Sequence, residues 1–150
     1  MVRVEEVARR GPPVTLVLDS SIALASLFSD EVTDAVRGAF DRAASEGIVV
    51  PQHWRIEMAN ALTMALRRGR IDAEFRRGAL ADLALLPIET DSHTNAHIWS
   101  EAISFADRYR LTLYDAAYLE LAHRRNLPLA TLDEDLREAA KRAGLEVLPA

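Results

Sequence analysis

Four acidic residues lie in sequence surroundings that are unusual for solvated surface acids. Asp19 ends a nearly continuous apolar run, and Glu57 lies in an apolar helical stretch. Asp115 is flanked by aromatic and alanine residues, and Asp133 directly follows a predicted strand. If these carboxylates gather at one edge of the protein, they repel one another unless divalent cations neutralise them. The chain has no cysteine, and hard oxygen ligands suit Mg²⁺ or Mn²⁺ better than zinc.

Such a set of oxygen ligands is typical of sites that hydrolyse phosphodiesters. A bound divalent ion lowers the pKa of water and neutralises charge that develops on phosphate, and two ions ~3.5–4 Å apart clamp both reacting oxygens. Four carboxylates offset the charge of two such ions, so we expect one or two Mg²⁺ or Mn²⁺ ions. His93 and His97 are spaced for one helix face, which leaves zinc as a weaker alternative because a third ligand is missing.

Three of these acids also have purely structural interpretations. Asp115 can belong to a capping box that begins at Thr112. Glu57 can be a first-turn acid that the helix dipole favours, and Asp133 can be a helix N-cap. These alternatives stay open for each acid taken singly.

The composition indicates one ordinary globular domain. The 150 residues are 49% hydrophobic and 27% charged, with a net charge of −5, which argues against non-specific coating of nucleic acid but leaves a metal-dependent enzyme open. No apolar run reaches the ~20 residues of a membrane span. The charged N-terminal residues do not form a signal peptide, and the absence of cysteine suits a reducing compartment. We therefore expect a cytoplasmic protein without membrane association.

The elements that position the acids alternate between strands and helices. Residues 1–13 are expected to form a tail and residues 14–150 a single domain. Within it we predict strands at 14–18, 48–51, 86–89, 127–130 and 145–148. Helices are predicted at 21–28, 32–46, 54–68, 72–85, 94–109, 112–125 and 133–142, with Ser21 capping the first and Ser92 or Thr94 the fifth. This alternation predicts a parallel α/β sheet with right-handed crossovers.

Several common catalytic motifs are absent from the sequence. No glycine-rich phosphate loop or G-x-G-x-x-G follows the first strand, and no G-x-S-x-G elbow occurs. A nucleotide-binding fold of those classes and a serine hydrolase therefore have no support.

Four blocks of the chain together resemble the PIN-domain ribonucleases, and most closely the VapC toxins of prokaryotic toxin–antitoxin pairs. The blocks are VLDSSIALA at 17–25, PQHWRIEMANAL at 51–62, LTLYDAAYLELA at 111–122 and LATLDEDLREAA at 129–140. The order and spacing of the blocks carry the resemblance, which covers nearly the whole chain after Pro13. The N-terminal extension and a second acid near Asp133 depart from the family pattern.

The resemblance implies a fold and a set of site residues. The fold is a three-layer PIN-like structure with a parallel five-stranded sheet of order 3-2-1-4-5 and helices on both faces, which places Asp19 and Asp133 at a topological switch point. The acidic quartet is matched by Asp19, Glu57, Asp115 and Asp133, and the supporting polar residues by Ser21, Asn60 and Thr131. Between the two acids after the fourth strand, we assign Asp133 as the metal ligand and Asp135 as a helix-start or outer-shell residue.

The resemblance also implies a function and partners. The expected activity is that of a Mg²⁺- or Mn²⁺-dependent endoribonuclease, the toxin of a VapBC-type pair, which cleaves structured RNA such as tRNA. A VapB-type antitoxin would occupy the active-site groove, and a homodimer would form through the very apolar helix at 54–68 and its partner at 72–85. The alternatives are a metal-dependent phosphatase of related topology, although no Asp-x-Asp pair follows the first strand, and a non-catalytic α/β binding module.

Overall fold

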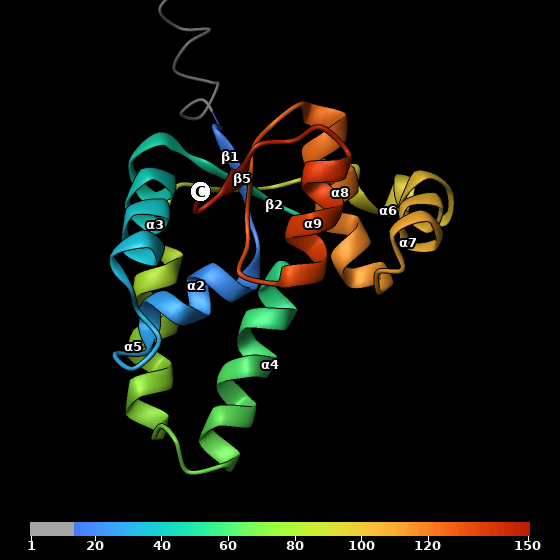
Figure 1. Cartoon of the computed structure of the whole chain (residues 1–150). Coiled ribbons are helices and arrows are strands. Elements are labelled where there is room, and N and C mark those ends of the chain that lie inside the picture. Colours follow the sequence, from blue (N-terminus) through green and yellow to red (C-terminus); the bar gives the residue numbers. More distant parts are fainter. Residues whose placement is uncertain (1–13) are drawn as a thin grey trace, which may run out of the picture.

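A computed structural model describes residues 14–150, so the predicted tail at residues 1–13 lies outside the described residues (Figure 1). Within this range, five short strands form one parallel sheet. The strands are β1 (Leu16–Leu18), β2 (Ile48–Val50), β3 (Ile88–Thr90), β4 (Leu129–Ala130) and β5 (Val147–Leu148). The predicted third strand is thus shifted by a residue or two, since Leu86 and Pro87 precede its start.

The sheet has the order β3-β2-β1-β4-β5, as predicted from the resemblance. All neighbouring strands are parallel, with Leu16 opposite Ile48 and Val17 opposite Leu129 on the two sides of β1. Strand β1 therefore lies in the middle, and all its side chains are fully buried. Because helices cover such a sheet, its central strand is a continuous apolar run, which is the pattern read at 14–18.

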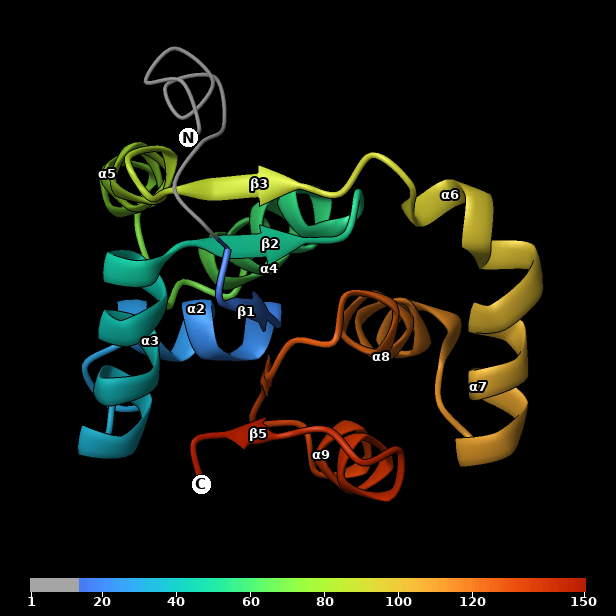
Figure 2. The same cartoon turned by 90° about the horizontal axis from the view of Figure 1, so that it is seen from above.

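Helices connect successive strands and lie on both sides of the sheet. They are α2 (Ser20–Leu27), α3 (Asp34–Glu46), α4 (Trp54–Arg67), α5 (Ala73–Ala84), α6 (Thr94–His97), a π-helical turn (Ile98–Ala102), α7 (Ile103–Tyr109), α8 (Leu113–Arg125) and α9 (Glu134–Arg142). In Figures 1 and 2, α3 and α5 lie on one side of the strands, and α7, α8 and α9 lie on the other. Helices α4 and α5 form the predicted hairpin, which extends away from the sheet (Figure 1).

Two predicted helix starts are wrong in detail. The N-cap of α2 is Asp19, not Ser21, and it makes no side-chain capping bond. The N-cap of α6 is His93, and its side chain also makes no such bond. Thr94 instead donates a 2.9 Å hydrogen bond to Asp91. Local hydroxyl residues suit a cap, but these two hydroxyls donate to nearby aspartates and accept from the distant Gln52 and Leu132 N–H groups.

The helix predicted at 94–109 is interrupted by the π-helical turn, and the very apolar helix predicted at 54–68 is only partly covered within the chain. Trp54, Met58 and Leu62 of α4 are buried, but Ile56 is 73% exposed. Within residues 14–150, no helix combines the length and apolar character that a membrane crossing requires.

Candidate active site

Asp19 lies at the carboxyl end of β1, where it is only 4% exposed. Its backbone N–H donates a 2.9 Å hydrogen bond to the Ala130 carbonyl of the neighbouring strand. Its carboxylate accepts hydrogen bonds from Ser21 Oγ at 2.6 Å, Thr131 Oγ1 at 2.7 Å and Ser20 Oγ at 3.5 Å. A buried carboxylate needs such partners, and these hydroxyls fix the direction in which it points.

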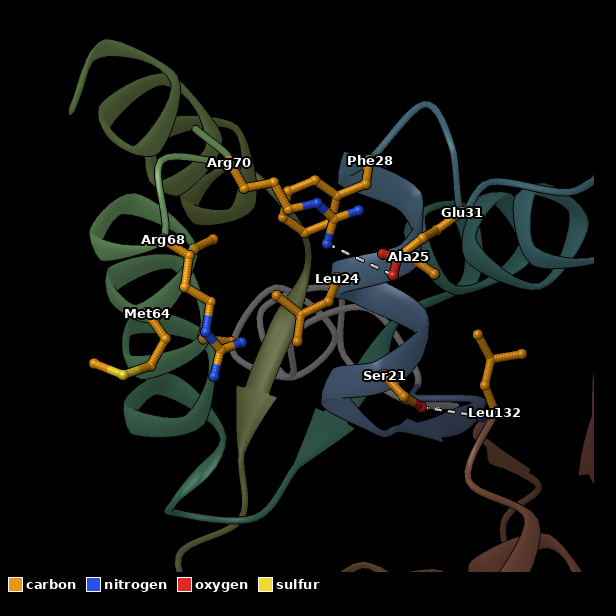
Figure 3. Close-up of a pocket in the computed structure, with 11 residues that line it drawn as sticks. Ser21, Leu24, Ala25, Phe28, Glu31, Met64, Arg68, Arg70 and Leu132 are labelled. Carbon is orange, nitrogen blue, oxygen red and sulfur yellow. Dashed lines mark hydrogen bonds and ion pairs between the residues drawn. The ribbon is translucent and has the colours of Figure 1, made fainter. Parts of the chain in front are cut away.

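The hydroxyls around Asp19 also fix the loop between β4 and α9. Ser21 Oγ accepts a 3.0 Å hydrogen bond from the Leu132 backbone N–H, a contact that Figure 3 draws. Thr131 Oγ1 accepts one of 3.1 Å from the Asp133 N–H. The predicted supporting residues Ser21 and Thr131 therefore join β1 to the segment that carries Asp133.

Glu57 lies in the first turn of α4 and points toward α8. Its Oε1 accepts a 2.5 Å hydrogen bond from the Tyr118 hydroxyl and lies 3.3 Å from His53 Nε2. Burial raises the pKa of Glu57 to about 7; the charges of Asp19 and Asp115 act in the same direction, whereas the hydrogen bond from Tyr118 opposes them. Glu57 does lie in the first turn of its helix, as the structural interpretation requires. Its carboxyl group is also partly removed from water and is influenced by other acids.

Asp115 occupies the first turn of α8. Its backbone N–H donates to Thr112 Oγ1 at 3.2 Å, so the predicted cap at Thr112 is present. Burial raises the pKa of Asp115 to about 6, and the negative charges of Asp133, Asp19 and Asp135 raise it further. The cap therefore places Asp115 within electrostatic reach of the other acids.

Asp133 and Asp135 both follow β4 in the chain. Asp133 is the N-cap of α9, because its Oδ1 accepts a 2.9 Å hydrogen bond from the Leu136 N–H. Asp135 lies in the first turn of the same helix. Both are exposed, and both charges help to raise the pKa of Asp115. The structural interpretation of Asp133 as an N-cap is therefore confirmed, and its role as a metal ligand stays a prediction.

The sequence interpretation missed two neighbours of Glu57 and included one residue without a contact. Tyr118 is fully buried and donates to Glu57, and its position three residues after Asp115 on one helix was the available signal. His53 precedes Glu57 by one helical turn, which was a similar signal. Asn60 is exposed, and its side chain makes no hydrogen bond to a described residue.

The donor set fits a hard divalent cation in its chemistry, since it consists of carboxylate and hydroxyl oxygens. Among residues 14–150, no three acidic or histidine side chains are close enough to form a ready metal site. This spacing still suits Mg²⁺, which keeps several waters and is usually bound by only one or two carboxylates. Asp19, Glu57, Asp115 and Asp133 are the residues that would hold it. The zinc alternative gains no support from His97, because its Nδ1 lies 3.1 Å from Glu101 and is already engaged by that carboxylate.

A groove of about 510 Å³ begins beside the acids and runs between α2 and α4 (Figure 3). Ser21 and Leu132 lie at its near end, next to Asp19. Its walls are mostly apolar and include Leu24 of α2, Phe28 just after α2, and Met64 of α4. The far end carries both charges: Arg68 lies there, and the Arg70 guanidinium lies 3.9 Å from the centre of the Phe28 ring and 3.7 Å from the Glu31 carboxylate.

Comparison with known proteins points to one family. The PIN domain family matches residues 16–142. The curated ribonuclease VapC3 of Mycobacterium tuberculosis is 34% identical over 130 residues, which cover 85% of this chain and 89% of the relative.

Solved structures show the same fold. The crystal structure of PAE2754 from Pyrobaculum aerophilum matches with a TM-score of 0.65 and 25% identity, over 89% of this chain and 83% of that chain. DNA-bound VapBC from Salmonella typhimurium matches with a TM-score of 0.60 and 16% identity, over 90% and 97% of the two chains.

Proposed function

Because the chain belongs to the PIN domain family, among the VapC ribonucleases, we propose that it is a divalent-metal-dependent endoribonuclease that acts through Asp19, Glu57, Asp115 and Asp133. One observation carries the proposal: acids from four distant segments of the chain act on one another electrostatically, because Asp19 helps to raise the pKa of Glu57 and Asp115, and Asp133 helps to raise that of Asp115. Acids that serve only as helix caps need no such neighbours. The ion is Mg²⁺ or Mn²⁺, and the site takes one or two.

A bound divalent ion would supply an activated water and would neutralise charge on the phosphodiester. Other residues of the chain hold and orient the carboxylates that would surround this ion. Ser21 and Thr131 keep the Asp19 carboxylate pointing out of the sheet edge, and Tyr118 holds Glu57 by its hydroxyl. Since the pKa of Glu57 is about 7, this carboxyl can take up or release a proton near neutral pH.

We propose structured RNA such as tRNA as the substrate. The net charge of −5 disfavours general RNA coating, whereas the groove beside the acids contains two arginines, Arg68 and Arg70, of which Arg70 is paired with Asp30 and Glu31. Phosphates on either side of the cut can contact such arginines. A cytoplasmic location belongs to the same proposal, because a chain without cysteine suits a reducing compartment.

The decisive experiment is RNA cleavage by the purified protein. We expect RNA, with tRNA tested first, to be cut in millimolar Mg²⁺ or Mn²⁺ and left intact after EDTA, with activity restored by added metal. Cleavage is followed by gel electrophoresis of end-labelled RNA. Cleavage that persists in EDTA would exclude the metal-dependent mechanism.

The proposed partner is a VapB-type antitoxin that occupies the groove between α2 and α4. The VapBC structure from Salmonella typhimurium has the same fold, which makes such a pair the first to test. The groove offers apolar walls from both helices, and at its near end Ser21 binds the Asp19 carboxylate. A segment with an apolar face and a basic side chain directed at the acids would match it.

We further propose a homodimer through the α4–α5 half of the molecule. Its large apolar side chains that stay exposed within one chain are Ile56, Phe75, Leu80 and Leu85. Such side chains mark association surfaces when they are grouped. Sedimentation at micromolar concentration, without antitoxin, is expected to give twice the chain mass of 16.6 kDa. A single-chain mass there would contradict the dimer.

A further inference from the structure

One arginine joins the loop that carries Thr131 and Asp133 to the last strand of the sheet. Arg137 lies in α9, and its Nη1 donates to the Thr131 carbonyl at 2.9 Å and to the Leu148 carbonyl at 3.3 Å. Its Nη2 donates to the Pro149 carbonyl at 2.7 Å. A single partly buried guanidinium thus contacts three backbone carbonyls in two segments.

These contacts share a residue with the carboxylate site. The residue whose carbonyl Arg137 binds is the same Thr131 whose hydroxyl donates to Asp19 and accepts from the Asp133 N–H. The Thr131 N–H in turn donates to the Leu148 carbonyl at 3.0 Å. Thr131 is therefore fixed from one side by the site and from the other by Arg137.

The loop has little other backbone support at this point. Strand β4 contains only two residues, Leu129 and Ala130, and ends immediately before Thr131. The Leu132 and Asp133 N–H groups donate to side-chain hydroxyls, not to a neighbouring strand. A short strand leaves the position of the following acid to such contacts.

Only a guanidinium can make this set of bonds. Arginine presents five donors in a rigid planar fork, whereas lysine carries a compact ammonium at the end of a flexible stem. A lysine at position 137 can reach one or two of the three carbonyls, and a methionine can reach none by hydrogen bonding.

We propose that Arg137 is a positioning residue of the site: it holds Thr131, and through it Asp19 and Asp133, in the arrangement that receives the divalent cation. The effect on cleavage rests on the proposed ribonuclease function, but the effect on the loop does not. Outer groups that orient ligands typically change metal affinity or activity by about 10–100-fold when they are replaced.

The test compares Arg137→Met with Arg137→Lys and with Lys141→Met. Lys141 lies on the same helix and is exposed, and its side chain makes no hydrogen bond or ion pair to residues 14–150, so its replacement removes the same charge without the contacts. The first measurement is amide hydrogen exchange of Thr131, Leu132 and Asp133 by NMR, with Val17 of β1 as the internal reference. The second is the Mg²⁺ concentration at half-maximal cleavage, with kcat and KM measured separately.

In Arg137→Met, exchange at residues 131–133 is expected to speed up by about 10-fold or more, while Val17 keeps its wild-type rate. The Mg²⁺ midpoint should rise and kcat fall by about 10–100-fold with little change in KM. Arg137→Lys should lie between this variant and the wild type, and Lys141→Met should match the wild type.

Wild-type exchange at residues 131–133 together with a wild-type Mg²⁺ midpoint in Arg137→Met would overturn the proposal. If Arg137→Met does not fold, Arg137→Lys decides by the same criteria. If the wild-type protein does not cut RNA, the ribonuclease proposal fails, and the exchange measurement alone decides whether Arg137 positions the loop.

Discussion

Replacing Asp19 with asparagine is expected to lower the rate of RNA cleavage at saturating Mg²⁺ by at least about 1,000-fold, and to leave the protein folded. Metal-assisted stabilisation of developing charge is worth several kcal/mol, and each ~1.4 kcal/mol is a factor of ten in rate. The fold should survive because an asparagine oxygen still accepts from the hydroxyls of Ser21 and Thr131, which can rotate to suit it. Cleavage rate and thermal melting are measured on the same preparation.

The matched control is Asp34→Asn. Asp34 is an exposed acid in the first turn of α3, and its replacement changes the net charge by the same amount. It should cut RNA at the wild-type rate. Full activity in Asp19→Asn would show that the acids at the sheet edge are not the active site.

The same assay ranks the two acids after β4. Asparagine is as good an N-cap as aspartate, so Asp133→Asn should keep α9 and isolate the loss of a carboxylate. We expect Asp133→Asn to reduce cleavage and raise the Mg²⁺ requirement more than Asp135→Asn does. The opposite ranking would assign the metal ligand to Asp135.

The metal-free protein is expected to lose stability as the pH rises from about 4.5 to about 7. The pKa of Glu57 is raised to about 7 and that of Asp115 to about 6, so in this window the folded state binds more protons than the unfolded state. The free energy of unfolding then decreases with pH. The Glu57 side chain is 28% exposed, which screens its interactions. We therefore expect about 1–3 kcal/mol for the two acids together, measured by urea unfolding in EDTA.

Millimolar Mg²⁺ should reverse this loss at pH 7.5 and have little effect at pH 5. A ligand that binds only the folded state stabilises it by mass action, about 2.7 kcal/mol at 100 times its Kd, and the cation competes with protons for the carboxylates. Glu57→Gln, which still accepts from Tyr118, should show a shallower pH dependence in EDTA. Burial lowers the pKa of His53, which acts in the opposite direction between pH 4.5 and pH 7, so the comparison of the two proteins decides: an equal pH dependence in the wild type and Glu57→Gln would contradict the raised pKa of Glu57.

The sequence predicted the sheet well because each strand has a clear local signal. The uninterrupted apolar run before Asp19 indicated a strand covered on both faces, and the alternation with helices required parallel pairing. The strand order came from the family resemblance, since no local pattern distinguishes the neighbours of β1. Helix starts were predicted less well, because the hydroxyls of Ser21 and Thr94 donate to the nearby Asp19 and Asp91 carboxylates and accept from the backbone N–H groups of distant residues.

The sequence indicated candidate site residues, which stay a prediction, but it could not indicate their contacts. The first three acids stood out because of their apolar neighbours, and Asp133 because it directly follows a predicted strand. The hydrogen bond from Tyr118 to Glu57 joins residues 61 positions apart, and no sequence pattern encodes such a pairing. The three carbonyls that Arg137 binds are equally invisible in sequence, because any residue has a carbonyl and only the fold brings these together.

The central place of β1 has a consequence for the order in which the protein acquires its site during synthesis. Thr131 binds Asp19 across 112 positions of the chain, and β1 pairs with β4 over a similar span. Contacts this distant in sequence form slowly, since the entropy of closing a long loop must be lost before the contact stabilises the chain. During translation the first three strands emerge long before β4 and β5. We therefore expect a nascent chain to carry Asp19, Glu57 and Asp115 without the Thr131 contact to Asp19, and to gain this contact only after β4 has emerged.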